Sequence, residues 1–172
     1  MFTRHALNPL ITPAQVHPSR PDYEVIGAFN AGAALVNGAT VLLVRVAERP
    51  LQTEVGWVVC PYLNAEGTIV LLRVRPDDPN YDTRDPRIVR HLPTGRVFLT
   101  SMSHIRRAHS ADGVHFTVDD QPFLQAETIY ETFGIEDARI TPLDDVYYIN
   151  YSAVSELGIA TGLAVTPAFQ AV

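Results

Sequence analysis

The stretch Glu131–Ser155, which reads ETFGIEDARITPLDDVYYINYSAVS, has the layout around which the rest of the chain is arranged. The acidic pair Glu136-Asp137 comes first, and Arg139 follows it. The segment 146–151 then alternates its side chains in the manner of a β-strand. We therefore expect a short strand, a turn and a second strand from this stretch.

The same unit of a polar residue, a strand, a turn and an apolar strand occurs twice earlier in the chain. Its leading polar residues are Asn30, Asp85 and Asp137, so the spacings are 55 and 52 residues. A strand-built repeat of about 50 residues is typical of a β-propeller. The sequence therefore predicts an all-β fold, with blade-like repeats that start near residues 30, 85 and 137 and with no helix longer than about two turns.

The length of 172 residues holds about three such repeats, whereas propellers usually close with ~4–8 blades. We predict a single, partial β-propeller domain over residues 1–172, with about three blades and an incomplete ring. Residues 1–29 should form an irregular, proline-containing segment and a first strand. The clearest hairpin is expected at Asn37-Gly38, the residue pair that a type I′ turn needs. An incomplete ring leaves open strand edges, through which self-association is expected.

The composition argues against several classes of partner and site. A net charge of −6 and a pI of about 5.4 argue against nucleic acid. No apolar run approaches the ~20 residues of a membrane span, and the N-terminus has no signal-peptide pattern. Cys60 is the only cysteine, which favours a cytoplasmic location. The histidines show no metal-ligand spacing, so no metal site is expected.

Equivalent positions of successive propeller blades converge on the central axis. Asn30, Asp85 and Asp137 are therefore expected to line one polar pocket, in which a carboxylic acid would protonate the leaving oxygen of a glycoside. Arg87 and Arg139 each follow an aspartate by two residues, and they are expected to bind phosphate or sugar hydroxyls. The alternative is that the aspartates only cap turns and that the arginines only form ion pairs between blades.

Several segments of the chain also resemble a known family. The segment 133–160, FGIEDARITPLDDVYYINYSAVSELGIA, is similar to the motif of glycoside hydrolase family 130, the β-mannoside phosphorylases and β-mannosidases. Further similar segments, in the order of the family, are NPLITP, PSRPDYEVIGAFNAGAAL, LLVRVAER, RDPRI and SHIRRAHSADGVHF. The resemblance extends to about Phe169, and it implies a five-bladed propeller of about twice this length.

The resemblance implies an inverting reaction on a β-mannoside, in which phosphate or a base-activated water attacks the anomeric carbon. Asp85 resembles the catalytic acid of the family, and Asp137 is the second choice. Asn30 and Arg45 resemble residues that bind the mannose ring, and Arg139 resembles a phosphate-binding arginine. The further substrate-binding candidates are Glu48, Arg87, His104 and Arg107.

The implied partner is a β-mannoside oligosaccharide, with inorganic phosphate as co-substrate and no other cofactor. Ala160 stands where many phosphorylases have a second arginine, which keeps hydrolysis open beside phosphorolysis. The family's later blades, which supply further phosphate ligands, are outside this sequence. The alternative function is a non-catalytic truncated propeller that binds carbohydrate or forms an oligomer. A third interpretation is a propeller of a neighbouring family that acts on arabinosides or fructosides.

Overall fold

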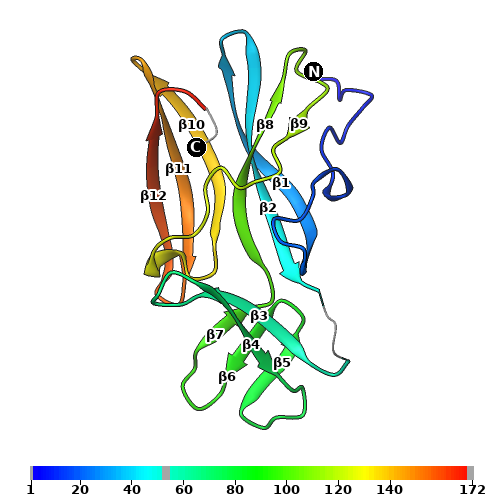
Figure 1. Ribbon diagram of the computed structural model, residues 1–172, viewed down its shortest axis with the longest axis vertical. Helices are drawn as coiled ribbons and strands as arrows, with labels where there is room; N and C mark the ends of the chain where they lie inside the picture. Colours follow the sequence, from blue (N-terminus) through cyan, green and yellow to red (C-terminus); the bar gives the residue numbers. More distant parts are fainter. Residues whose placement is uncertain (1, 52–54, 170–172) are drawn as a thin grey trace.

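The computed structural model describes residues 2–51 and 55–169, and strands dominate it (Figure 1). The strands form four sheets, in the orders β1-β2-β8-β9, β10-β11-β12, β3-β4 and β5-β6-β7. The helical segments within the described ranges are two short 3₁₀ turns, η1 (Pro13–Gln15) and η2 (Ile129–Glu131). The predicted all-β fold is confirmed.

The first sheet consists of β1 (Tyr23–Val36), β2 (Ala39–Pro50), β8 (Met102–Ser110) and the short β9 (Thr117–Val118), all antiparallel. The predicted hairpin at Asn37-Gly38 joins β1 to β2. Both turn residues have positive φ values, 50° and 82°, which a type I′ turn requires.

The second sheet consists of β10 (Ile135–Leu143), β11 (Val146–Ser155) and β12 (Gly158–Thr166). It stands beside the first sheet, with β10 next to β1 and β8 (Figure 1). A side chain at Gly32 of β1 would place its Cβ 2.6 Å from the carbonyl oxygen of Ala138, so the close approach of β1 to β10 requires glycine there. Apolar side chains fill the space between the sheets, namely Val41, Leu43, Ile105, Ile135, Ala138, Ile149 and Phe169.

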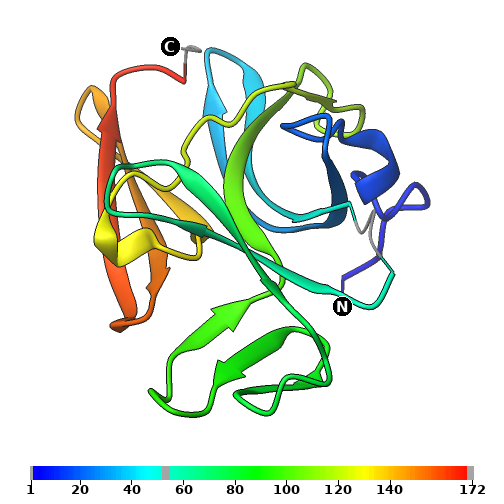
Figure 2. The same cartoon turned by 60° about the horizontal axis from the view of Figure 1, so that its bottom comes forward.

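The chain leaves the first sheet after β2 and returns to it with β8. The intervening strands are β3 (Val58–Leu63), β4 (Ile69–Val74), β5 (Tyr81–Asp85), β6 (Ile88–His91) and β7 (Val97–Leu99). They lie at the bottom of Figure 1, and Figure 2 turns this end forward. The unit that starts near residue 85 is thus inserted within the first sheet, and it does not follow that sheet as an equivalent repeat.

The backbone around two of the three leading polar residues is alike. The pairing register of β1 with β2 shifts around Asn30, and that of β10 with β11 shifts around Asp137. Asn30 has φ of 51° and Asp137 has φ of 54°, whereas Asp85 is not among the residues with positive φ. A β-bulge re-aims the side chains next to it. Asn30 and Asp137 are therefore structurally equivalent, and Asp85 is not.

The segment before β1 covers the outer face of the first sheet (Figure 2). Its Val16 packs against Val44, Val46 and Ala108 in a small apolar cluster. Among the described residues, no helix has the length and apolarity that crossing a membrane requires. The expected cytoplasmic location stays a prediction.

Candidate active site

The carboxylate of Asp137 lies where the first two sheets meet. Its Oδ1 accepts hydrogen bonds from Asn30 Nδ2 at 3.0 Å and from Arg45 Nη1 at 3.2 Å. Its Oδ2 has no hydrogen bond to any of the described residues, and the side chain is 35% exposed. One oxygen is therefore fixed in place, and the other remains available to a bound molecule.

Arg45 organises this cluster from the middle of β2. Its Nη2 donates to Glu136 Oε1 at 2.5 Å, and its Nε donates to Ser103 Oγ at 3.1 Å. The guanidinium also lies over the Phe29 ring, 4.7 Å from the ring centre. Charge-assisted hydrogen bonds in such a partly buried place are stronger than those on an open surface. Arg45 therefore holds both acidic side chains of the pair in defined positions.

Glu136 is a member of the cluster that the sequence did not single out as a site residue. Burial raises the pKa of its carboxyl group, and the neighbouring Asp137 charge adds to this, while Arg45 opposes it. The acidic pair was visible in the sequence, but nothing there showed that a strand more than 90 residues earlier supplies the cation for both carboxylates.

Ser103 was also missed, and its backbone position depends on a glycine. Ser103 forms a parallel β-bridge with Gly134, which has φ of 104°. A Cβ at Gly134 would collide with the backbone of Ser103, so only glycine allows β8 to lie this close to the start of β10. This contact places the Ser103 hydroxyl beside Arg45.

Arg139, the predicted phosphate ligand, lies at the junction of the two bulges. Its Nη1 donates to the carbonyl oxygens of Ala138 at 2.9 Å, and of Asn30 and Asp137 at 3.3 Å each. The side chain is exposed, and its Nε and Nη2 make no hydrogen bond to the described residues. Arg139 is thus anchored by one nitrogen next to Asp137, with further N–H groups available.

The expectation that Asp85 converges with Asn30 and Asp137 is wrong. Asp85 lies on β5 in the inserted segment, and its Oδ1 accepts from the backbone N–H of Arg87 at 2.8 Å and from Arg87 Nε at 3.4 Å. Those hydrogen bonds, the backbone one first, lower the pKa of the Asp85 carboxyl. The hollow beside it is lined by residues 82–90 alone. Asp85 therefore caps a local turn, as the alternative for the aspartates proposed, and Arg87 pairs with it within that turn and not between blades.

Two further substrate-binding candidates, Glu48 and His104, lie on the opposite face of the first sheet from Arg45. Side chains alternate along a strand, and Glu48 is three residues from Arg45. Both are buried with Arg106 beneath the N-terminal segment. Arg107 lies on the same face as Arg45, opposite Leu43 in the register, but it is held apart from the Asp137 cluster by hydrogen bonds from its Nε to Asp119 Oδ2 at 2.8 Å and from its Nη1 to the Phe169 carbonyl oxygen. Sugar binding by these three residues stays a prediction.

The described residues contain no group of three or more histidine, cysteine or acidic side chains arranged to hold a metal ion. The chemistry available at the Asp137 cluster is that of carboxylic acids, a guanidinium and an amide. This set suits proton transfer and the binding of sugar hydroxyls.

Comparison with known proteins identifies the family to which this chain belongs. Residues 95–172 match the glycoside hydrolase 130 model, which is described as β-1,4-mannooligosaccharide phosphorylase. The chain is 49% identical over 170 residues to a β-1,2-mannobiose phosphorylase of Listeria innocua, and the match covers 97% of this chain and 48% of that protein. The solved complex of that Listeria innocua enzyme with β-1,2-mannobiose aligns with a TM-score of 0.88. The chain belongs to glycoside hydrolase family 130.

The family fold is a five-bladed β-propeller, and this chain covers about half of one. The chain likewise spans about half the length of the Listeria innocua protein. A Bacteroides ovatus glycosyl hydrolase shares the fold at 17% identity, with a TM-score of 0.57 over 95% of this chain and 37% of that one. The resemblance found in the sequence is confirmed.

Proposed function

We propose that the Asp137 cluster is the reaction centre of a β-mannoside phosphorylase or mannosidase, with Asp137 as the proton donor. The observation that carries this proposal is the contact of one carboxylate with both Asn30 and Arg45, the two residues expected to bind the mannose ring. Asp85, the first choice from the sequence, makes its side-chain hydrogen bonds to Arg87 and none to Asn30 or Arg45, so it is not retained as the donor.

The proposed reaction is an inverting substitution at the anomeric carbon. Asp137 gives its proton to the glycosidic oxygen as the bond from that oxygen to the anomeric carbon breaks. A phosphate oxygen forms the new bond from the opposite side, which yields mannose 1-phosphate and the released sugar. Arg45 orients the acid, and Asn30 and Arg45 are positioned to bind sugar hydroxyls.

Arg139 is proposed to bind the attacking phosphate, because its free N–H groups lie next to Asp137. Ala160 lies on β12, and the family resemblance implies a second arginine at this position, so water remains the alternative nucleophile. The Listeria innocua relative is a β-1,2-mannobiose phosphorylase, which makes β-1,2-mannobiose the first substrate to test.

The test is product release from β-1,2-mannobiose with and without inorganic phosphate. Mannose 1-phosphate that forms only with phosphate indicates phosphorolysis, and mannose without phosphate indicates hydrolysis. Asp137→Asn should abolish release, whereas the matched change Asp85→Asn should leave it unchanged. Loss of activity in Asp85→Asn with retention in Asp137→Asn would reverse the assignment of the acid.

A second candidate function is a non-catalytic piece that associates through its open sheet edge. The observation that favours it is a row of exposed apolar side chains on β12, formed by Ile159, Leu163 and Val165. Such a row on an unpaired edge strand is a site for association. Light scattering after gel filtration tests this candidate, and Ile159→Lys should return an oligomer to monomers. A monomeric chain that releases product excludes it.

A further inference from the structure

The Glu136 carboxylate has one oxygen that the described residues leave unused. Its Oε1 accepts from Arg45 Nη2 at 2.5 Å, whereas its Oε2 makes no hydrogen bond to the described residues. This oxygen is not one of the buried side-chain atoms that lack a partner, so solvent reaches it, although the side chain is only 21% exposed. A bound molecule can therefore reach an acceptor whose position the other oxygen fixes.

The unused oxygen of Glu136 belongs to the same cluster as the unused oxygen of Asp137. Adjacent nitrogens of one guanidinium, Nη2 and Nη1 of Arg45, donate to Oε1 of Glu136 and to Oδ1 of Asp137. Because the guanidinium is planar, both carboxylates are held at its edge. Two fixed carboxylates with one open oxygen each can accept from neighbouring hydroxyl groups of a sugar ring, since each hydroxyl donates one hydrogen bond.

The charges around Glu136 favour a neutral ligand over an anion. Glu136 and Asp137 share the single positive charge of Arg45. The three groups together carry one excess negative charge when both acids are ionised, and none when Asp137 carries its proton. Neither state attracts phosphate. Arg139, which donates only to backbone carbonyl oxygens among the described residues, keeps its charge for that ligand. The Glu136 end of the cluster therefore suits the sugar, and the Arg139 end suits the phosphate.

An aromatic ring beside the cluster adds an apolar surface. Phe29 is 41% exposed, although the Arg45 guanidinium lies 4.7 Å from its ring centre. The ring lies against the backbone at Gly27, where a Cβ would collide with it, so the ring has a fixed place. Sites for small molecules combine apolar surface of this kind with a few fixed polar groups. A sugar, which has both C–H faces and hydroxyl groups, matches this combination.

We propose that Glu136 is a substrate-binding residue, whose Oε2 accepts a hydrogen bond from one hydroxyl group of the mannose ring. This role rests on the proposed function, because that function places the sugar at the Asp137 cluster. Glu136 also holds Arg45, so the same carboxylate fixes the guanidinium through one oxygen and binds the sugar through the other. The residue thereby selects sugars that carry a hydroxyl group at one ring position.

The test is titration of the chain with methyl β-mannoside and with its analogues that each lack one hydroxyl group, followed by the NMR signal of the Arg45 Nε–H. Glu136→Gln keeps the size of the side chain but replaces one acceptor oxygen by an NH₂ group. This variant should bind methyl β-mannoside about ten- to hundredfold more weakly, the effect of losing a hydrogen bond to a charged group. Loss of one particular hydroxyl should weaken binding to the unchanged protein by a similar factor, but binding to Glu136→Gln by less than about threefold.

Glu156→Gln is the matched control. Glu156 also accepts from an arginine, Arg96, at 2.6 Å and is 29% exposed, but it lies at the turn between β11 and β12. This variant should bind every sugar as the unchanged protein does. If Glu136 only supported the fold, Glu136→Gln would weaken the binding of all analogues by the same factor. That outcome, or the absence of saturable binding, overturns the proposal.

Product release, measured on the same proteins with β-1,2-mannobiose, separates this proposal from the proposed function. Release by the unchanged chain, together with equal penalties for each analogue in the unchanged protein and in Glu136→Gln, leaves the reaction in place and overturns the role of Glu136. A penalty for one hydroxyl that disappears only in Glu136→Gln supports that role even when no product forms, and the missing product then counts against the reaction alone.

Discussion

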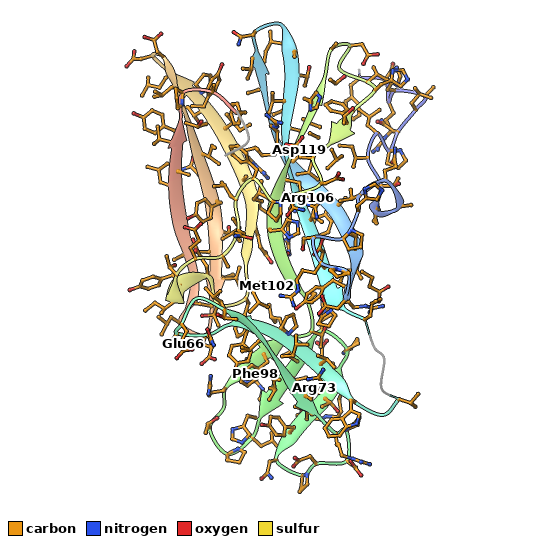
Figure 3. The ribbon with its side chains drawn as sticks, viewed as in Figure 1. Glu66, Arg73, Phe98, Met102, Arg106 and Asp119 are labelled. Atoms are coloured by element: carbon orange, nitrogen blue, oxygen red, sulfur yellow. The ribbon has the colours of Figure 1, made fainter. Side chains whose placement is uncertain are left out.

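Replacing Arg106 by methionine tests the buried ion pair between Arg106 and Glu48 most directly. Methionine retains the apolar stem but removes the charge and the hydrogen bonds to Glu48, His104 and the carbonyl oxygens of Asp119 and Asp120. Figure 3 shows Arg106 on β8 with Asp119 beside it. Glu48, which is 3% exposed, would keep Ser19 as a donor but lose its cation.

The size of the effect follows from that uncompensated charge. Removing one partner of a buried ion pair costs about 3–5 kcal/mol. Since whole domains are stable by only about 5–15 kcal/mol, Arg106→Met should remove about a fifth or more of the free energy of unfolding. Urea unfolding followed by Trp57 fluorescence measures this change.

Two comparisons make the measurement decisive. Each single change, Glu48→Gln or Arg106→Met, leaves one buried charge without its partner, whereas the double variant leaves none. The double variant should therefore lose clearly less free energy of unfolding than the sum of the two single variants. Arg49→Met breaks a half-exposed pair with Glu24 and should cost below about 1 kcal/mol. Equal costs for Arg106→Met and Arg49→Met, or strict additivity of the double variant, would refute the reasoning.

Three further outcomes are expected. Gly134→Ala and Gly158→Ala both impose a side chain at a φ near 105°, which costs about 1–3 kcal/mol of strain. Only the Cβ at position 134 would also collide with backbone, so the Gly134→Ala protein should have the lower melting temperature of the two variants. Burial lowers the folded-state pKa of His104 from its ordinary 6.5 to about 3. The unfolded chain therefore takes up the proton first, and the free energy of unfolding should fall by about 1.4 kcal/mol per pH unit as the pH drops below about 6.5. His104→Gln should flatten that slope in urea unfolding measured from pH 7 to pH 4. Burial raises the pKa of the Cys60 thiol to about 12, so a thiol reagent at pH 8 should label it only after denaturant is added.

The fold was predictable because its local signals agree with one another. Alternation along the strands and the Asn37-Gly38 turn are written in neighbouring residues, and the structure has both. The return of β8 to pair with β2 was not predictable, since that pairing joins residues about 60 positions apart and leaves no periodic trace. The prediction for Asp85 was wrong because the spacing from Asn30 to Asp85 resembles that of successive blades, although Asp85 lies in the segment inserted between β2 and β8.

The candidate site was predictable in part. Asn30 and Asp137 lead two real repeats, and they meet at the same kind of bulge. The face of Glu48 was also written in the sequence, because an odd separation from Arg45 on one strand sends the two side chains to opposite sides. Ser103 gave no comparable signal, since its role depends on how closely β10 approaches β8.

The backbone at the two bulges gives an independent reason to regard the Asp137 cluster as functional. Asn37 and Asp144 also have positive φ values, 50° and 52°, but they lie in hairpin turns that require this conformation. Asn30 and Asp137 adopt it in the middle of strands, where it interrupts the ladder, and Arg139 Nη1 donates to three carbonyl oxygens there. A strained backbone conformation of this kind costs free energy and persists only where the surrounding structure enforces it, and such residues are concentrated at sites that bind ligands or catalyse reactions. The two bulges direct an amide and a carboxylate toward each other and toward one guanidinium, and the proposed role of Asp137 as the proton donor rests on this arrangement.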